Sequence, residues 1–314
     1  MKKLVRVSFI VVMMLSLLLT VSCASKKANS EDQDVVPGEK PVATESMIID
    51  HRHTDLKDVP LEWINKAKTD LHIAYGHTSH GSQITDGMSG LVSFASAPNG
   101  GSTYAWNGGG TDGALDLRDC AMGGDVGYFP QWVDNTCSYL GDVNSATGRG
   151  SKNPDVNVIM WSWCGQAAGL TEQQMISNYL APMSDLETKY WGVKFVYMTC
   201  HLDGSGSDGN LNQRNEQIRA CCSANKKILF DFADIESYDP DGQTNYMPLK
   251  ADDACNYQLN GQTRNWATEW QNSHTKGVDW YQCSSAHSQP LNANRKAYAA
   301  WWMWARMAGW NGGA

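Results

Sequence analysis

Short apolar runs alternate with longer amphipathic segments in the second half of the chain, and this alternation restricts the fold more than any other sequence feature. Runs typical of buried strands occupy residues 156–161, 193–199 and 227–231. Helical segments lie between them at 171–190 and 212–224, and a last helix is predicted at about 292–307. Strands that alternate with helices indicate a parallel sheet covered on both faces. We therefore predict a three-layer α/β/α fold around a central, mostly parallel sheet.

The preceding part of the chain is less regular. Helical patterns at residues 60–68 and 83–94 flank a strand-like run at 71–75. Residues 97–152 are rich in glycine, asparagine and aspartate, so we predict long loops there, with one helix near 131–140.

Polar and reactive side chains gather where the predicted strands end. These ends are residues 76–80, 161–166, 199–203 and 231–236. In parallel α/β sheets, ligands bind beyond the carboxyl ends of the strands. We therefore expect the active site at this edge of the sheet.

Ser79 and His287 are the predicted nucleophile and base. Ser79 lies in the turn Gly76-His-Thr-Ser-His-Gly81, directly after a strand. A serine hydroxyl needs a base within hydrogen-bond reach, and a tight turn directs backbone N–H groups toward a developing oxyanion. His287 precedes the last helix and is the predicted base, although serines and histidines in loops are more often ordinary turn or surface residues.

Further candidates support this pair. Gln166 follows a strand end, where its amide could donate to the oxyanion. Asp231 and Asp234 are the predicted carboxylates that orient the base. The predicted substrate-binding residues at the strand ends are His77, His80, Trp163, His201 and Asp203. His77, His80 and His201 also compete with His287 as the base.

These residues make the chain similar to the GDSL/SGNH hydrolase superfamily, as a His-x-Ser-x-Gly variant. The resemblance covers about residues 71–310 and implies a flavodoxin-like sheet, with Ser79 as the nucleophile. The family's Gly-x-Asn-Asp block corresponds to Trp161-Ser-Trp-Cys-Gly-Gln166, where Gln166 replaces the asparagine. Its Asp-x-x-His block corresponds to Ser284-Ser-Ala-His287, so the aspartate is absent. The resemblance implies a serine esterase without a cofactor that removes acyl groups, such as acetyl, from a polysaccharide.

Two other functions stay open. The missing asparagine and aspartate favour a carbohydrate-binding protein on the same fold that carries out no chemistry. His77, His80 and His201 together would suit a metal-dependent hydrolase, because histidine is the commonest metal ligand.

The beginning of the chain predicts export. Lys2, Lys3 and Arg6 precede an apolar run at residues 7–21, which indicates a signal peptide over residues 1–22. The stretch Leu19-Thr-Val-Ser-Cys23 resembles a bacterial lipoprotein signal, which implies a lipid on Cys23; plain secretion and a membrane-spanning anchor are the alternatives. We expect a flexible tether over residues 23–46 and one domain over residues 47–314, located in the bacterial cell envelope.

The composition restricts the partners. Removing the signal would leave 22 basic and 33 acidic residues, a net charge of −11, and no basic cluster. Nucleic acid is therefore not an expected partner, and membrane contact would come only from the lipid on Cys23. Eight of the nine cysteines follow Cys23. In an exported protein they predict disulfides, and spacing favours Cys120 with Cys137 and Cys255 with Cys283.

Overall fold

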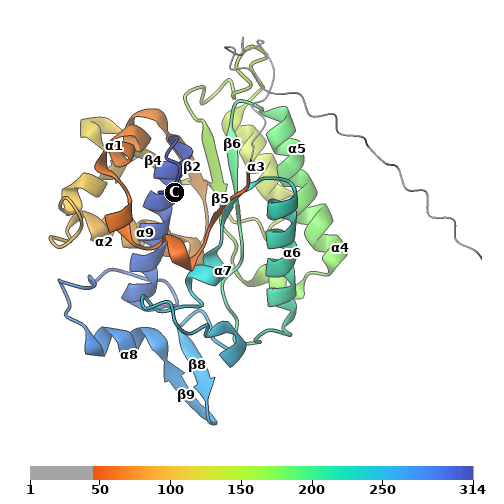
Figure 1. Ribbon diagram of the computed structural model, residues 1–314. Coiled ribbons are helices and arrows are strands. Elements are labelled where there is room, and N and C mark those ends of the chain that lie inside the picture. Colours follow the sequence, from red (N-terminus) through yellow and green to blue (C-terminus); the bar gives the residue numbers. More distant parts are fainter. Residues whose placement is uncertain (1–44, 314) are drawn as a thin grey trace, which may run out of the picture. The chain divides into compact units, whose positions relative to one another are not determined.

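The computed structural model describes residues 45–313 and contains a seven-stranded, fully parallel central sheet (Figure 1). The strand order is β1-β7-β6-β5-β2-β4-β3. The strands are β1 (Met47–Ile49), β2 (His72–Gly76), β3 (Trp106–Asn107), β4 (Leu115–Met122), β5 (Val158–Trp161), β6 (Lys194–Met198) and β7 (Ile228–Phe230). The prediction of a central parallel sheet is confirmed.

Helices cover both faces of the sheet, which gives the predicted three layers (Figure 1). One face carries α1 (Leu61–Asp70), α2 (Ser82–Val92) and α9 (Pro290–Met307). The other carries α3 (Gln131–Leu140), α4 (Glu172–Met175), α5 (Ala181–Lys189) and α6 (Asn210–Ala224). A π-helical turn, Ile176–Leu180, joins α4 to α5, and Thr171 caps α4 in a capping box with Gln174.

Alternating side chains of the strands fill both cores. In β5, Val158 and Met160 belong to the core under α9, whereas Ile159 and Trp161 belong to the core under α3 and α5. This is the two-residue period of a strand that is buried on both faces. Such strands are continuously apolar, which is why the sequence shows them clearly.

The region predicted as long loops, residues 97–152, contains two strands that were missed. β4 alternates apolar and charged residues, Leu115-Asp-Leu-Arg-Asp. Asp116 is nevertheless buried, because it accepts hydrogen bonds from Arg118 and lies 2.9 Å from the ring of His72 in β2. Arg118 in the same strand and His72 in the neighbouring strand thus balance the charge of Asp116. The charged residues had made this segment resemble a loop. The helix predicted at 131–140 is α3.

The chain between β7 and α9 adds a small layer of its own. It contains α7 (Phe232–Ile235), the antiparallel hairpin β8 (Asn256–Leu259) and β9 (Gln262–Asn265), and α8 (Trp266–Ser273). The loop before β8 lies beside the loop after β6, through a bridge between Asp203 and Asp252 and a Gly204 N–H bond to Ala251. This pairing places residue 253 at the carboxyl edge of the sheet.

The strand order locates the expected ligand site. The series β4-β2-β5-β6-β7 is the flavodoxin-like strand order. The chain adds β4 on one side of β2 and then β5, β6 and β7 on the other side, so the strand order reverses next to β2. That switch point lies between β2 and β5, which pair directly. The loops after β2 and β5 therefore border the crevice where such sheets bind ligands.

The predicted signal peptide, Cys23 and most of the predicted tether, residues 1–44, lie outside the described residues. Within residues 45–313, no helix has the length and apolar character needed to cross a bilayer.

Two glycines hold the turn after β2 against β5. A Cβ on Gly76 would lie 2.4 Å from the indole ring of Trp161. A Cβ on Gly81 would lie 2.3 Å from Ser162 Oγ and 2.4 Å from His77 Cβ. Close approach of the turn to β5 therefore requires glycine at both positions.

We expect Gly81→Ala to lower the free energy of unfolding by about 1–3 kcal/mol, because the added methyl group overpacks the turn. Gly108→Ala is the matched control, since a Cβ there meets no atom within 4 Å, and its effect should stay within about 0.5 kcal/mol. Urea unfolding of both variants measures the difference. Equal stability of the two variants would contradict the packing described for Gly81.

Candidate functional site

Six side chains meet beyond the carboxyl ends of β2, β5 and β6, and we call them the strand-end cluster: Ser79, His80, Cys164, His201, Asp253 and His287. Ser79 and His80 lie in the 3-10 turn Ser79–Gly81 that leads from β2 into α2, and Cys164 follows β5. They therefore occupy the switch point of the sheet. His201 follows β6, and His287 lies shortly before α9.

His80 is the centre of the strand-end cluster. Its Nε2 lies 2.9 Å from Asp253 Oδ2, and its Nδ1 lies 3.2 Å from Cys164 Sγ. The ring is buried, whereas Cys164 and Asp253 are half-buried. A thiol, an imidazole and a carboxylate are thus connected in series.

The protonation states follow from these contacts. Burial alone would raise the pKa of Asp253, but the His80 hydrogen bond and the nearby His201 lower it below its ordinary value. Burial lowers the pKa of His80, and His201 adds to this, against the opposing effect of Asp253. At neutral pH an ionised Asp253 can only accept, so Nε2 of a neutral His80 carries the proton. Nδ1 then has a free lone pair that can accept from the Cys164 thiol.

Two further imidazoles, those of His201 and His287, stack on His80. The ring of His201 lies 3.9 Å away at 8°, and that of His287 lies 4.6 Å away at 25°. His201 Nδ1 lies 2.6 Å from the carbonyl oxygen of Leu202, whereas its Nε2 is buried and has no hydrogen-bond partner. His287 is exposed and has a positive φ of 61°.

The predicted pair of Ser79 and His287 lies in the strand-end cluster, but the two side chains are not hydrogen-bonded to each other. Ser79 is exposed, and its Oγ lies 3.8 Å from Cys164 Sγ. Among the described residues, no histidine lies within hydrogen-bond distance of Ser79 Oγ. Within the strand-end cluster, the histidine in contact with both a thiol and a carboxylate is His80.

Gln166 lies at the strand ends, but Asp125 holds its amide. Gln166 Nε2 donates to Asp125 Oδ1 at 3.0 Å, and Asp125 Oδ2 accepts from Thr78 Oγ1 at 2.5 Å. Gln166 Oε1 is buried without a partner. The contacts of Gln166 thus support the loop that precedes Ser79, and they leave its role as an oxyanion donor a prediction.

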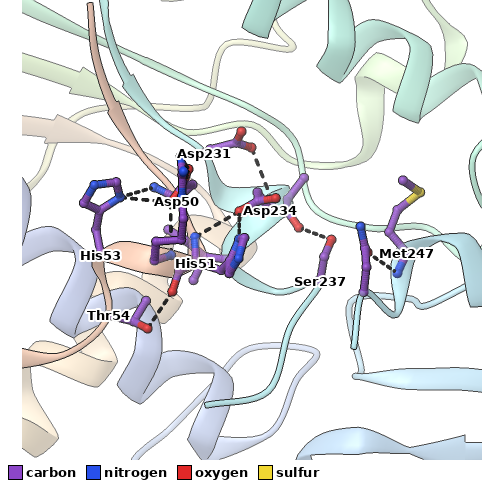
Figure 2. Close-up of polar contacts among 12 residues, drawn as sticks. Asp50, His51, His53, Thr54, Asp231, Asp234, Ser237 and Met247 are labelled. Carbon is purple, nitrogen blue, oxygen red and sulfur yellow. Dashed lines mark hydrogen bonds and ion pairs between the residues drawn. The ribbon is translucent and has the colours of Figure 1, made fainter. Parts of the chain in front are cut away.

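Asp231 and Asp234 lie at a different place, beyond β1 and β7 (Figure 2). Asp231 accepts from Arg219 at 2.7 Å and from Thr199, and it caps α7. Asp234 lies 2.5 Å from His51 Nδ1. Both carboxylates line a cavity of about 510 Å³ that none of the six cluster residues lines. The carboxylate beside the clustered histidines is Asp253, so neither predicted acid partner contacts the base.

The remaining predicted binding residues divide into three environments. His77 turns to Asp119, with 2.7 Å between Nε2 and Oδ1, and it does not join His80 and His201. Trp163 is 2% exposed and packs edge-on against Tyr179, so it belongs to the core and lines no open cleft. Asp203 is exposed, and Ser205 donates to it from its backbone and its hydroxyl.

The predicted disulfides are not found. All eight cysteines of the described residues are free thiols, including Cys120, Cys137, Cys255 and Cys283. Cys120 lies at the end of β4 beside His77, and Cys137 accepts from Lys189 across the helical layer. Cys255 is buried beside Ser288, and Cys283 accepts from Asn294. Sequence spacing therefore misjudged both pairs, because each thiol is committed to a different neighbour.

A buried ion pair connects the loops that carry the clustered histidines. Lys296 of α9 and Glu236 have side chains only 0% and 1% exposed, with 2.7 Å between Nζ and Oε2. Glu236 also accepts from the backbone N–H of Leu202, next to His201. Lys296 also donates to Gln83 Oε1 in α2, three residues after His80.

Gln83 completes this network on the side of His287. Its Nε2 donates to the carbonyl oxygen of Ala286 at 2.6 Å, one residue before His287. Asn292 adds a contact of 3.3 Å to Glu236. One continuous hydrogen-bond network thus joins the neighbours of His80, His201 and His287.

Sequence reasoning missed Asp253 and the contact of Cys164 with His80. Cys164 lies within residues 161–166, a strand end rich in reactive side chains. Its position at the topological switch point is the sequence signal that could have identified it. Asp253 had no local signal, because its position depends on the pairing of two loops far apart in the sequence.

Comparison of this chain with models of protein families, with curated proteins and with solved structures found no match. The GDSL/SGNH resemblance accordingly stays a prediction from the sequence.

We expect Lys296→Met to lower the free energy of unfolding by about 3–5 kcal/mol, because it leaves the Glu236 carboxylate buried without its partner. The double variant Lys296→Met/Glu236→Gln should recover most of this loss, since the amide oxygen still accepts from Leu202. Urea unfolding of the two variants and the wild type measures both effects. A single variant as stable as the wild type would show that the buried pair does not hold the loops together.

Proposed function

We propose that this protein is a hydrolase that cleaves esters through a covalent acyl intermediate formed at the strand-end cluster. One observation carries the proposal: His80 lies in hydrogen-bond contact with both Cys164 and Asp253. A nucleophile, a base and a carboxylate that orients the base form the arrangement used for nucleophilic acyl transfer.

Cys164 is the nucleophile that this geometry favours. Its thiol proton passes to His80 Nδ1 as sulfur attacks the ester carbonyl carbon. When the tetrahedral intermediate collapses, His80 returns the proton to the leaving alcohol oxygen, and a thioester remains on Cys164. His80 then takes a proton from a water molecule whose oxygen attacks the thioester carbon. As the carbon–sulfur bond breaks, His80 returns this proton to sulfur, which releases the carboxylic acid and restores the thiol. Asp253 stabilises the imidazolium in both steps.

Ser79 is the second candidate for the nucleophile. Its hydroxyl is exposed at the end of β2 and lies 3.8 Å from Cys164 Sγ, so both atoms face the same space. The resemblance to GDSL/SGNH hydrolases supports Ser79, whereas the contact with His80 supports Cys164. Hydrogen bonds of catalytic groups often tighten only when substrate binds.

The substrate class follows from the sequence. The resemblance implies an O-acyl group, such as acetyl, on a polysaccharide. A signal-like beginning with a lipoprotein-type Cys23 supports an exported, lipid-anchored enzyme that meets such glycans in the cell envelope. A carbohydrate-binding protein without activity is the alternative that inactivity would favour.

We expect Cys164→Ala and His80→Gln each to lower the rate of acetate release from an acetylated polysaccharide, and from a small acetyl ester, by at least about a hundredfold. Cys221→Ala is the matched control, because this thiol lies on α6, away from the strand ends. Steady-state kinetics of the purified protein measure the rates, and circular dichroism checks the folding of each variant.

Ser79→Ala in the same assay distinguishes the two nucleophiles. If Cys164 is the nucleophile, the rate should fall far less in Ser79→Ala than in Cys164→Ala, and iodoacetamide should abolish the activity. Loss of activity in Ser79→Ala alone, with labelling of Ser79 by a serine-directed phosphonate, would assign the reaction to the serine. A wild-type protein that cleaves neither substrate would reject the proposed function.

A further inference from the structure

A second arrangement is available to the same histidines. His80, His201 and Asp253 offer ligand atoms that all lie within 4.8 Å of one another. Two imidazoles and one carboxylate, with a further position open, form a ligand set that suits Zn²⁺. In a tetrahedral site with bonds of about 2.0–2.1 Å, ligand atoms are roughly 3.4 Å apart. The rings of His80 and His201 are stacked at 8°, so both imidazoles would have to rotate out of this stack for their nitrogens to reach one ion.

His201 is the independent observation that points to a ligand. His201 is only 8% exposed, and its Nε2 has no hydrogen-bond partner. Its Nδ1 lies 2.6 Å from the Leu202 carbonyl oxygen, which fixes the proton on Nδ1 and leaves a lone pair on Nε2. Metal-binding histidines have this same arrangement, in which one ring nitrogen donates to a carbonyl group and the other faces the ion.

The surroundings give these side chains well-defined positions. Leu202 N–H donates to the buried Glu236, which holds the loop beside His201. The bridge between Asp203 and Asp252 holds the loop of Asp253 against that of His201. Both loops are thus held in place, with the Asp253 carboxylate beside His80 Nε2 and the ring of His201 stacked on that of His80.

We propose that Zn²⁺ binds between His80, His201 and Asp253 and thereby inhibits the hydrolase. The inhibitory part rests on the proposed function, whereas the binding part does not. A neutral imidazole has one lone pair, so His80 that binds Zn²⁺ through Nε2 carries its proton on Nδ1. That nitrogen can then no longer accept the Cys164 proton. Zinc binding and proton transfer at His80 therefore exclude each other.

Isothermal titration of the chelator-treated full-length protein with Zn²⁺ tests the binding part without any substrate. We expect one high-affinity ion per chain and a rise in Tm, because an ion that binds only the folded state stabilises it. His201→Gln and Asp253→Asn should each weaken binding by at least about tenfold, the smallest loss seen even for residues that only support a ligand.

Three control variants define the site. His274→Gln removes a histidine that stacks on Trp270 outside every candidate metal cluster, and it should bind Zn²⁺ as the wild type does. His51→Gln tests the rival cluster of Asp50, His51 and Asp234, and His77→Gln tests that of His77, Asp119 and Cys120. Absence of binding, or binding lost in His51→Gln or His77→Gln but kept in His201→Gln, would overturn the proposed site.

Ester hydrolysis with increasing Zn²⁺ tests the inhibitory part. The wild-type rate should fall with the affinity found by titration, and His201→Gln should need at least about tenfold more Zn²⁺ for the same fractional loss of its own rate. Stimulation by Zn²⁺ would overturn inhibition and favour a metal-dependent hydrolase. Zinc binding by a protein that cleaves no ester would refute the proposed function alone, and ester cleavage without zinc binding would refute this inference alone.

Discussion

The buried ion pair between Lys296 and Glu236 is the interaction on which the arrangement of the site depends. Removing two charges from water is costly, and their attraction compensates only when further hydrogen bonds satisfy the remaining donors and acceptors. Here those further bonds come from Gln83, Leu202 and Asn292. The ion pair therefore stays buried by recruiting polar groups next to each clustered histidine, and α9 becomes part of the site although it contributes no residue to it.

The parallel sheet and the pairing of loops beyond it each bring part of the strand-end cluster together. The parallel strands bring Ser79, His80 and Cys164 to the switch point, because the loops after β2 and β5 leave the sheet side by side. Loop pairing beyond β6 then adds His201 and Asp253. His80 is buried between Cys164 from the strand ends and Asp253 from the paired loops. One ring nitrogen therefore contacts a thiol and the other contacts a carboxylate. That position is the basis for both roles proposed for His80, proton transfer and metal binding.

The sequence predicted those parts of the fold whose signals are local. Continuous apolar runs identified β5, β6 and β7, since strands buried on both faces need no polar side chains. β4 was missed because its charged residues Asp116 and Arg118 are accommodated by contacts with each other and with the distant His72 and Asp155, which no local pattern reveals. For the same reason the sequence identified Ser79, His80, His201 and His287 as candidates but assigned Asp231 and Asp234 as acids. Which carboxylate reaches a histidine depends on the pairing of distant loops, and no local pattern encodes it.

We propose that acyl transfer passes through Cys164 at the switch point. Rapid acid quenching during turnover of an acetyl ester, followed by peptide mass spectrometry, tests this most directly. An acyl group on the peptide that contains Cys164, formed in the wild type and lost on treatment with hydroxylamine, is the predicted result. An acyl group on Ser79 would keep the site but contradict this nucleophile, whereas an unmodified protein that still turns over would contradict the covalent mechanism itself.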